Sequence, residues 1–403
     1  MNVISDAVVA EAIGDMLRAS HLLAPDDLPM LVQKTARTLG ALDGVAYLAN
    51  REQSELVPLS TDGRRSALPI DTTIAGRTFA DVQAHQSSTS SGDAVLWCPM
   101  LDGTERVGAL ELTFAADQDV TDPQLQKAAA SLATLAAELV VTRSAYGDGL
   151  EMPRRRIPMT LPAEMLWTML PPLTFATEQV VIAGVLSPCH EVAGDTFDYT
   201  LNGDTVHLAI FDAMGHGMSA TLFASVALGA YRNARRTGLD LVDTARSIDK
   251  QLGAQFGADV FVTGILAELN VTNGYYRWVN AGHPPVLLLR GGRVIKDLDQ
   301  VVSPPLCLLD DKPSVAEERL EPGDRLVFYT DGLVEARDTD GEFFGTDRLA
   351  EFIVREESKG RPAPETLRRL NAAVLAHQDG ELQDDATVML VEWRGGNRPG
   401  VRS

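Results

Sequence analysis

The hydrophobic pattern of the first 150 residues changes between helical and extended spacing. Apolar positions recur every three or four residues in two segments, which predicts helices at 7–20 and at 28–40, the second ending at Gly40. Shorter apolar runs predict three strands, at 44–50, 94–100 and 106–114. The last two strands flank Asp102-Gly103, a pair typical of a tight turn.

Residues 60–93 are rich in Thr, Ser, Gly and Asp, and we expect a long binding-type loop there. A helix is predicted over 122–145. Its apolar positions step by four and three, forming a heptad-like seam of Leu125, Ala129, Leu132, Ala136 and Leu139. Two interpretations are open: the seam pairs two copies of the chain in a homodimer, or the helix packs on its own domain.

Residues 177–395 have the pattern of a β-rich domain with helices in two blocks. A strong helix is expected over 218–238. Hairpins are predicted at Asn273-Gly274, as a type I′ turn, and at Gly291-Gly292. Because the segment has many hairpins and no βαβ rhythm, we expect an α+β fold whose antiparallel sheets are covered by helices.

Composition narrows the class of protein. Of the 403 residues 45% are apolar and 23% charged, which is typical of globular proteins, and the formal net charge is -21. Such an acidic field repels nucleic acid and anionic membranes, so neither is an expected partner. The sequence has no apolar run of membrane-spanning length and an acidic N-terminus unlike a secretory signal. We therefore expect a soluble, cytoplasmic protein.

Four acidic residues stand at strand ends or in turns that contain glycine: Asp195, Asp212, Asp331 and Asp384. Each is also compatible with an ordinary turn or helix cap, where Asp is common. If the four converge, they form an oxygen-rich site for two hard divalent cations, Mn²⁺ or Mg²⁺. The three cysteines are scattered and the histidines form no pair suited to zinc.

The segments around these residues, VAGDTFDY, FDAMGHGMSA, VNAGHPP, FYTDGLVEA and DDATVML, occur in an order that resembles the SpoIIE/RsbU-type branch of the PPM metal-dependent protein phosphatases. The resemblance covers nearly all of 177–395 and implies a PPM-type α-β-β-α sandwich. It implies that metal is held by Asp195, Asp212, Asp331 and Asp384 and by the backbone carbonyl of Ala213. The sequence departs from the family pattern at four positions, Ala193, Thr196, Ala213 and Met214, none of which removes a carboxylate.

Three further residues are candidates to support the site without binding metal themselves: His216, Asp198 and Asp385. Imidazole titrates near neutral pH, so His216 could act beside a metal-activated water. The alternative is a turn histidine bonded to backbone, and we favour it. Asp385 is ranked below its neighbour Asp384 as a ligand. His283, between Gly282 and two prolines, is expected to be structural.

The N-terminal region, 23–146, resembles a GAF domain, a small α/β sensor module. The resemblance rests on the strand pair around Asp102-Gly103, with Pro99, Gly108 and the closing helix in the usual order. The expected organisation is an N-terminal helix, a sensor domain, a linker with a regulatory helix, a phosphatase domain and a tail, at 1–22, 23–146, 147–176, 177–395 and 396–403. Three arginines at 154–156 are expected to be solvated in the linker, and the helix at 161–170 is expected to pack near the strands bearing Asp195 and Asp212.

The two resemblances together imply a serine/threonine protein phosphatase under the control of a sensor domain. Its implied substrate is a phosphorylated STAS-type anti-anti-sigma protein in a partner-switching pathway, and the sensor domain could bind a small molecule or a protein. Two alternatives are a non-catalytic signalling module and a diguanylate cyclase, since Ala193-Gly194-Asp195 faintly resembles a cyclase motif. A cyclase would leave Asp331 and Asp384 unexplained.

Overall fold

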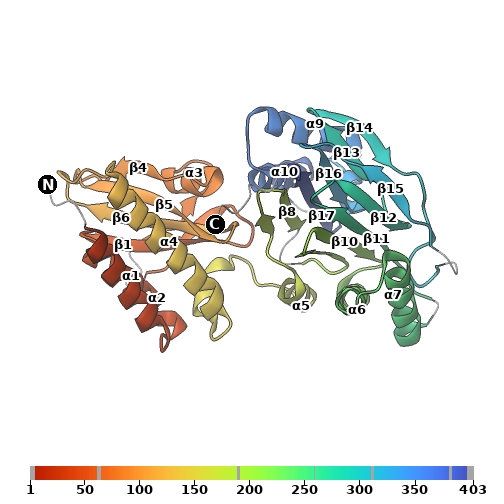
Figure 1. The fold of residues 1–403 in the computed structure, drawn as a ribbon, viewed down its shortest axis with the longest axis horizontal. Helices are drawn as coiled ribbons and strands as arrows, with labels where there is room; N and C mark the ends of the chain where they lie inside the picture. The colour runs from red at the N-terminus through yellow and green to blue at the C-terminus, as the bar shows by residue number, and fades with distance from the viewer. Residues whose placement is uncertain are drawn as a thin grey trace. The chain divides into compact units, whose positions relative to one another are not determined.

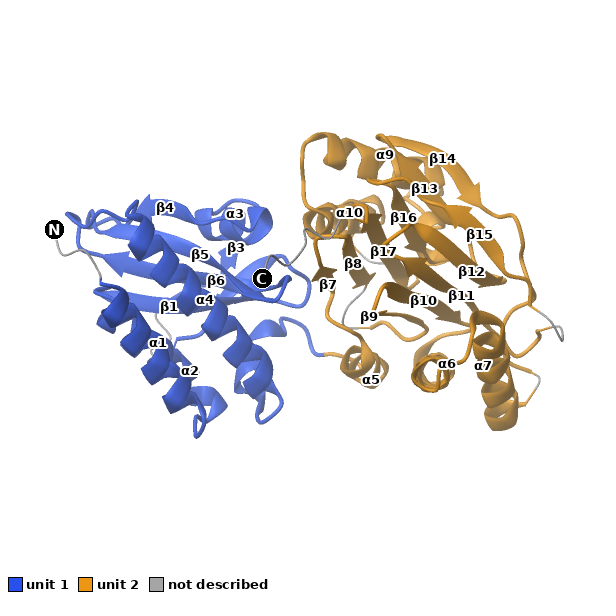
Figure 2. Cartoon of the chain, viewed as in Figure 1, with its two compact units in different colours: residues 1–158 blue, residues 159–403 orange. Residues whose placement is uncertain are grey.

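The computed structural model describes residues 5–60, 65–187, 191–257, 259–309, 313–380 and 384–396. The chain divides into two compact units, 1–158 (unit 1) and 159–403 (unit 2), coloured separately in Figure 2. Most of the expected tail, 397–403, lies outside the described residues. No helix in the described ranges is both long and apolar enough to cross a bilayer.

Unit 1 is a six-stranded antiparallel sheet with helices on both faces (Figure 1). Its strands, in the order β3-β2-β1-β6-β5-β4, are β1 (Asp43–Ala49), β2 (Glu55–Pro58), β3 (Leu68–Pro69), β4 (His85–Ser88), β5 (Ala94–Asp102) and β6 (Glu105–Phe114). Helices α1 (Asp6–Ser20), α2 (Leu28–Thr38) and α4 (Pro123–Ser144) share the main core with one face. The short α3 (Ile74–Asp81) covers the other. The expected α/β domain is therefore confirmed.

Two expectations for unit 1 need correction. The region 60–93 is not one long loop, because it contains β3, α3 and β4. Helix α3 has only eight residues and begins after Thr73, whose side chain accepts a hydrogen bond from the backbone N–H of Gly76 at 3.0 Å. So short a helix leaves almost no periodic signal among polar residues.

The heptad-like seam of α4 is explained by packing within unit 1. All five seam residues are at most 5% exposed and belong to the core that α4 shares with the sheet. They are therefore not free to pair two copies of the chain. Of the two interpretations, the structure supports the helix packed on its own domain.

The segment after α4 is anchored to unit 1. The side chain of Arg154 donates from Nε to the carbonyl of Ala49 at 2.9 Å, and the backbone N–H of Arg51 donates to the carbonyl of Arg154 at 3.0 Å. Glu151 forms an ion pair with both arginines. The expectation of a solvated Arg154 is therefore wrong.

Unit 2 is a sandwich of two antiparallel sheets. One sheet has the order β15-β12-β11-β10-β9 and comprises β9 (Asp195–Asn202), β10 (Thr205–Ala213), β11 (Val262–Asn270), β12 (Tyr275–Ala281) and β15 (Ala316–Arg319). The other has the order β14-β13-β16-β17-β8-β7 and comprises β7 (Thr174–Ala176), β8 (Val180–Ser187), β13 (Val286–Arg290), β14 (Arg293–Leu298), β16 (Arg325–Tyr329) and β17 (Ala386–Trp393). Side chains from both sheets form one core between them.

Helices cover the outer face of each sheet (Figure 1). Helices α5 (Leu161–Met169), α6 (Gly217–Arg236) and α7 (Leu241–Phe256) share a core with the β9–β12 sheet. Helices α8 (Asp331–Val334), α9 (Gly345–Ser358) and α10 (Ala363–His377) pack on the other sheet. This is the expected α-β-β-α sandwich. Helix α5 contributes Ala163 and Leu166 to the core that contains Phe211 and Ala213 of β10, as expected for the segment 161–170.

The two predicted hairpins exist, but only one has the expected turn. Gly291 and Gly292 both have positive φ, 57° and 72°, and join β13 to β14 as a two-residue turn. Among the described residues of the other hairpin only Gly274 has positive φ, and its N–H donates to the carbonyl of Asn270 at 2.8 Å. The turn between β11 and β12 is therefore longer than a two-residue type I′ turn. The side chain of Asn270 stabilises it by accepting hydrogen bonds from the backbone N–H groups of Thr272 and Asn273.

Candidate metal centre

The four predicted acidic residues come from the ends of four strands, two in each sheet of unit 2. Asp195 is the first residue of β9 and Asp212 the penultimate residue of β10, and the two are directly paired across these strands. Asp331 follows β16 after one residue, and Asp384 precedes β17, the strand paired with β16. The fold thus places all four at the same end of the sandwich, which we call the mouth.

The strand alternation of β9 and β10 determines where these side chains point. Side chains two residues apart face the same side of a sheet. Phe197 of β9 and Ile210 of β10 belong to the core between the sheets. Asp195 and Asp212 are two positions from them and therefore face the same interior, at its rim. Asp195 is 2% exposed.

Two hydrogen-bond systems join the sheets at the mouth. The Thr330 hydroxyl donates to Oδ2 of Asp195 at 2.6 Å and accepts from the backbone N–H of Thr387 at 2.9 Å. Oδ2 of Asp385 accepts from the backbone N–H groups of Ala193 and Gly194, each at 2.8 Å. The turn before Asp195 is thus held by a carboxylate from the opposite sheet.

Two glycines in the motifs permit close backbone approach. A Cβ added at Gly332 would lie 2.0 Å from the carbonyl oxygen of Asp385, which no side chain could tolerate. A Cβ at Gly194 would lie 2.8 Å from the carbonyl oxygen of Ala213. The glycines bring Asp331 next to Asp384 and Asp385, and Asp195 next to Ala213.

The mouth carboxylates are Asp195, Asp212, Asp331, Asp384 and Asp385, and burial with neighbouring negative charge raises the pKa values of Asp195, Asp212, Asp331 and Asp385. Burial, followed by the negative charges of Asp212 and Asp385, raises the pKa of Asp195 well above its ordinary value. Burial and the charges of Asp331, Asp384 and Asp385 raise the pKa of Asp212 to about 7. The pKa of Asp331 is also raised, by burial and then by Asp384. Buried like charges disfavour ionisation.

Among the described residues, no Lys, Arg or His side chain hydrogen-bonds or ion-pairs with any mouth carboxylate. Five carboxylates, with the carbonyl of Ala213 beside them, form an all-oxygen donor set of the kind that hard divalent cations prefer. In the described ranges, no three Asp, Glu, His or Cys side chains are grouped so that they could hold a metal ion as they stand.

Two supporting candidates do not join this group. Asp198 faces the opposite side of the sheet, where Arg232 and Arg235 of α6 contact it at 2.7 and 2.8 Å. His216 is exposed, immediately before α6, and its side chain makes no capping hydrogen bond to that helix.

Thr330 was not anticipated as a site residue from the sequence. It precedes Asp331 in the FYTDGLVEA segment, but only the fold brings its hydroxyl to Asp195, 135 positions earlier in the chain. The sequence likewise did not predict that Asp385 accepts hydrogen bonds from the backbone of Ala193 and Gly194. The sequence offers one signal for both residues: each is a polar residue directly beside a carboxylate of a motif, Thr330 beside Asp331 and Asp385 beside Asp384.

Part of the chain is similar to known proteins. Residues 202–394 match the family model described as Stage II sporulation protein E (SpoIIE). The chain is 24% identical over 215 residues to Phosphoserine phosphatase RsbU of Bacillus subtilis, covering 53% of this chain and 63% of that protein. It is 23% identical over 283 residues to Protein IcfG of Synechocystis sp., covering 63% of this chain and 42% of that protein. The chain thus spans less than two thirds of the length of these relatives.

The chain is also similar to solved structures, at lower sequence identity than to these relatives. The SiaA-PP2C domain of Pseudomonas aeruginosa has 18% sequence identity and a TM-score of 0.49, covering 57% of this chain and 94% of that one. The PP2C phosphatase domain of SpoIIE from Bacillus subtilis, with a fragment of its regulatory domain, has 20% identity and a TM-score of 0.46, covering 60% and 78%.

Proposed function

Because residues 202–394 form a domain of the SpoIIE family, we propose that the chain is a metal-dependent protein phosphatase acting on phosphoserine or phosphothreonine. The observation that carries the proposal is the mouth: it has five carboxylates at four strand ends and no cationic side chain on them in the described residues, and the pKa values of Asp195, Asp212, Asp331 and Asp385 are raised. A group of unpaired carboxylates of this kind would be stabilised by a bound cation.

We assign the metal ligands to Asp195, Asp212, Asp331, Asp384 and the carbonyl of Ala213, and the ions to two Mn²⁺ or Mg²⁺. When bound, two such ions supply a nucleophile at neutral pH and offset the charge of the phosphoryl group.

The remaining polar residues of the mouth act on these ligands. Thr330 fixes Oδ2 of Asp195 by donating its hydroxyl hydrogen to it. Asp385 holds the Ala193–Gly194 backbone and so the start of β9. Because two of its backbone hydrogen bonds occupy Oδ2, Asp385 is better suited to this supporting role than to binding metal. Groups of this kind orient ligands and maintain their charge.

The substrate is proposed from the relatives. RsbU and RsbP of Bacillus subtilis are both named phosphoserine phosphatases. With the resemblance to the partner-switching branch of the family, this favours a phosphorylated STAS-type anti-anti-sigma protein as substrate. Unit 1 would then be the GAF-like sensor that controls the reaction.

The test is hydrolysis of a phosphoserine peptide by the full chain with added Mn²⁺ or Mg²⁺, and with EDTA. We expect phosphate release with either metal and none in the chelator. Full turnover in EDTA by protein with no measurable metal would refute the two-metal proposal. Metal binding without hydrolysis of any phosphopeptide would instead favour a non-catalytic signalling module. Conversion of GTP without phosphopeptide hydrolysis would favour a cyclase.

A further inference from the structure

His283 is a buried histidine that the proposed mechanism does not use. It is 4% exposed and lies in the loop between β12 and β13. Its backbone is fixed by Asn280, whose side chain accepts from the His283 N–H and donates to the His283 carbonyl, both at 2.8 Å. Asn280 is itself fully buried. The loop is therefore built to hold this ring in one place.

The ring lies in line with the metal ligands of the first sheet. Its Nδ1 is 2.9 Å from the hydroxyl of Thr263. Thr263 of β11 is the direct cross-strand partner of Asp212, which is in turn the partner of Asp195. Directly paired residues of neighbouring strands face the same side of a sheet. Thr263 therefore extends the row of Asp195 and Asp212, and His283 is attached to its end.

The other edge of the ring faces the second sheet. Among the described residues, the buried Nε2 has no hydrogen-bond partner of ordinary geometry, while the backbone of Tyr329 is close enough to interact with the ring. Tyr329 is the last residue of β16, two positions before Asp331. The imidazole thus spans the gap between the sheet that carries Asp212 and the strand that leads into Asp331.

Burial lowers the pKa of His283 to about 3, and the backbone of Tyr329 opposes this only in part. The ring is therefore neutral at physiological pH and adds no positive charge to the carboxylates. A neutral imidazole carries one N–H and one acceptor nitrogen, which suits contact with a hydroxyl on one side and a backbone carbonyl on the other.

We propose that His283 is a positioning residue that sets the separation of the two sheets at the mouth, and with it the spacing of Asp195 and Asp212 from Asp331 and Asp384. This inference rests on the proposed phosphatase function. It assigns His283 no proton transfer and no contact with substrate. Its effect is on metal affinity, because carboxylates held too far apart cannot share the same pair of ions.

The experiment measures Mn²⁺ binding to the full chain by calorimetry, for wild type, His283→Phe and His283→Gln. Phenylalanine keeps the ring shape without nitrogen atoms, whereas glutamine keeps an amide that can contact Thr263. We expect His283→Phe to bind Mn²⁺ about tenfold more weakly, as when partners of metal ligands are removed, and His283→Gln to lie nearer wild type. Excess Mn²⁺ should restore most of the turnover of His283→Phe, with an unchanged pH profile.

Unchanged Mn²⁺ affinity in folded His283→Phe would overturn the inference and leave the phosphatase proposal intact. Loss of one limb of the pH profile at saturating Mn²⁺ would also overturn it, by showing proton transfer. A wild type that binds no Mn²⁺ would remove the proposed function and this inference with it. If His283→Phe does not fold, Thr263→Val removes the hydroxyl partner without changing shape. Its Mn²⁺ affinity should fall, and an unchanged value would overturn the inference.

Discussion

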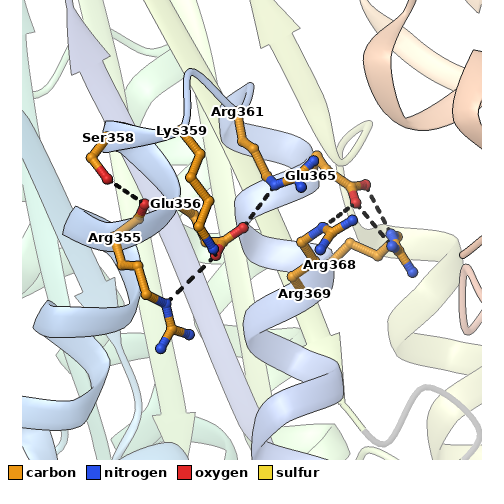
Figure 3. A network of polar contacts seen from close by, with 8 residues as sticks. All are labelled: Arg355, Glu356, Ser358, Lys359, Arg361, Glu365, Arg368 and Arg369. Atoms are coloured by element: carbon orange, nitrogen blue, oxygen red, sulfur yellow. Dashed lines mark hydrogen bonds and ion pairs between the residues drawn. The ribbon is translucent and has the colours of Figure 1, made fainter.

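Unit 2 has buried carboxylates near both ends of its sandwich, Asp195 at the mouth and Glu356 and Glu365 at the other end, but the two ends differ in their cationic partners. At the corner between α9 and α10, Glu356 is 2% exposed and contacts Lys359 at 2.6 Å, Arg361 at 2.9 Å and Arg355 at 3.6 Å (Figure 3). Glu365, also buried, contacts Arg368 at 2.9 Å and Arg369 at 2.7 Å. Each carboxylate at this corner therefore has at least two cationic partners.

The corner and the mouth lie at opposite ends of the same strands. Arg325, the first residue of β16, contacts Glu357 at the end of α9 and Glu392 near the end of β17. Asp331 follows the last residue of β16. At that end the described residues provide carboxylates and hydrogen-bond donors but no cation.

The difference shows what each end requires. A buried charge is costly unless it is paired, so a carboxylate without a cation must take up a proton or an external ion. The corner is complete as folded and has a structural role. At the mouth, the raised pKa values of Asp195 and Asp212 show that burial and neighbouring carboxylates disfavour the ionised forms, so positive charge there would stabilise them.

The largest expected effect follows from removing one ligand at the mouth. Asp212→Asn keeps the shape but loses a charge, and we expect hydrolysis to fall about 1000-fold, since metal-based stabilisation of the transition state amounts to several kcal/mol. Asp331→Asn should lower the rate of hydrolysis by a similar factor. The metal-free fold should become slightly more stable, because one repulsive charge is gone. Initial rates with a phosphopeptide, beside thermal melts in EDTA, measure both effects.

The matched control is Asp299→Asn, a substitution at an exposed position outside the mouth. It should leave rate and melting temperature unchanged. A wild-type rate in Asp212→Asn would show that the ligand is wrongly assigned. A destabilised metal-free Asp212→Asn would show that Asp212 is compensated in the folded protein, and the contrast between the two ends would disappear.

At the corner, removing a carboxylate should lower the stability of the fold, in contrast to the slight gain expected for Asp212→Asn at the mouth. Glu365→Ala leaves Arg368 and Arg369 without their buried partner. Removing one member of a buried ion pair costs about 3 to 5 kcal/mol, so urea unfolding should show a loss of that order. Metal affinity and turnover of the protein that remains folded should not change. A stability equal to wild type would mean that the corner arginines are already solvated.

The pH dependence of stability should also differ between the ends. The folded-state pKa of Asp212 is raised to about 7, above the ordinary value of 3.8, so between these values the folded protein binds more protons than the unfolded chain. Without metal, stability should therefore fall as pH rises from about 4 to 7, by at most about 1.4 kcal/mol per pH unit for this group. Urea unfolding in EDTA from pH 5 to 8 measures the slope, and Asp212→Asn should flatten it.

Glu356 contributes in the reverse direction. Burial alone would raise its pKa, but Lys359 and Arg361 outweigh burial and hold the pKa below its usual value. Its stabilisation is present above the unfolded pKa and is lost as the pH falls below it. With saturating Mn²⁺ the mouth should behave in the same way, because metal binding requires deprotonated ligands. A negative slope that persists in Mn²⁺ would place the metal elsewhere.

The sequence indicates the candidate ligands more directly than it indicates their surroundings. Asp195, Asp212, Asp331 and Asp384 could be proposed because an acidic residue at the end of an apolar strand is unusual and local in sequence. Thr330 and Asp385 could not be assigned their roles, because each acts across the two sheets on residues more than 130 positions away. Such contacts depend on strand order, which no periodic pattern contains.

The same reason explains the misjudged elements. The seam of α4 has one hydrophobic pattern whether it faces a second helix or its own sheet, and only the fold shows that Leu132 is buried in unit 1. The Asn273-Gly274 turn was misjudged because the side chain of Asn270, outside the two-residue motif, determines the loop. Arg154 was taken for a solvated linker residue because its acceptor, the Ala49 carbonyl, is 105 positions away.

The smallest expected effect concerns redundancy at the corner. Lys359 is half exposed. If Lys359 were removed, Glu356 would keep its ion pairs with Arg361 and Arg355. Exposed ion pairs contribute about 0 to 1 kcal/mol, so Lys359→Met should lower stability by less than about 1 kcal/mol and leave turnover unchanged. Urea unfolding at low and high salt gives the measurement, and the small loss should shrink further in salt. A loss of more than about 2 kcal/mol would mean that the partners of Glu356 act as one unit instead of substituting for one another. The corner should tolerate the loss of a cation because others remain, whereas the described part of the mouth has no side-chain cation to lose and, under the proposed function, binds metal instead.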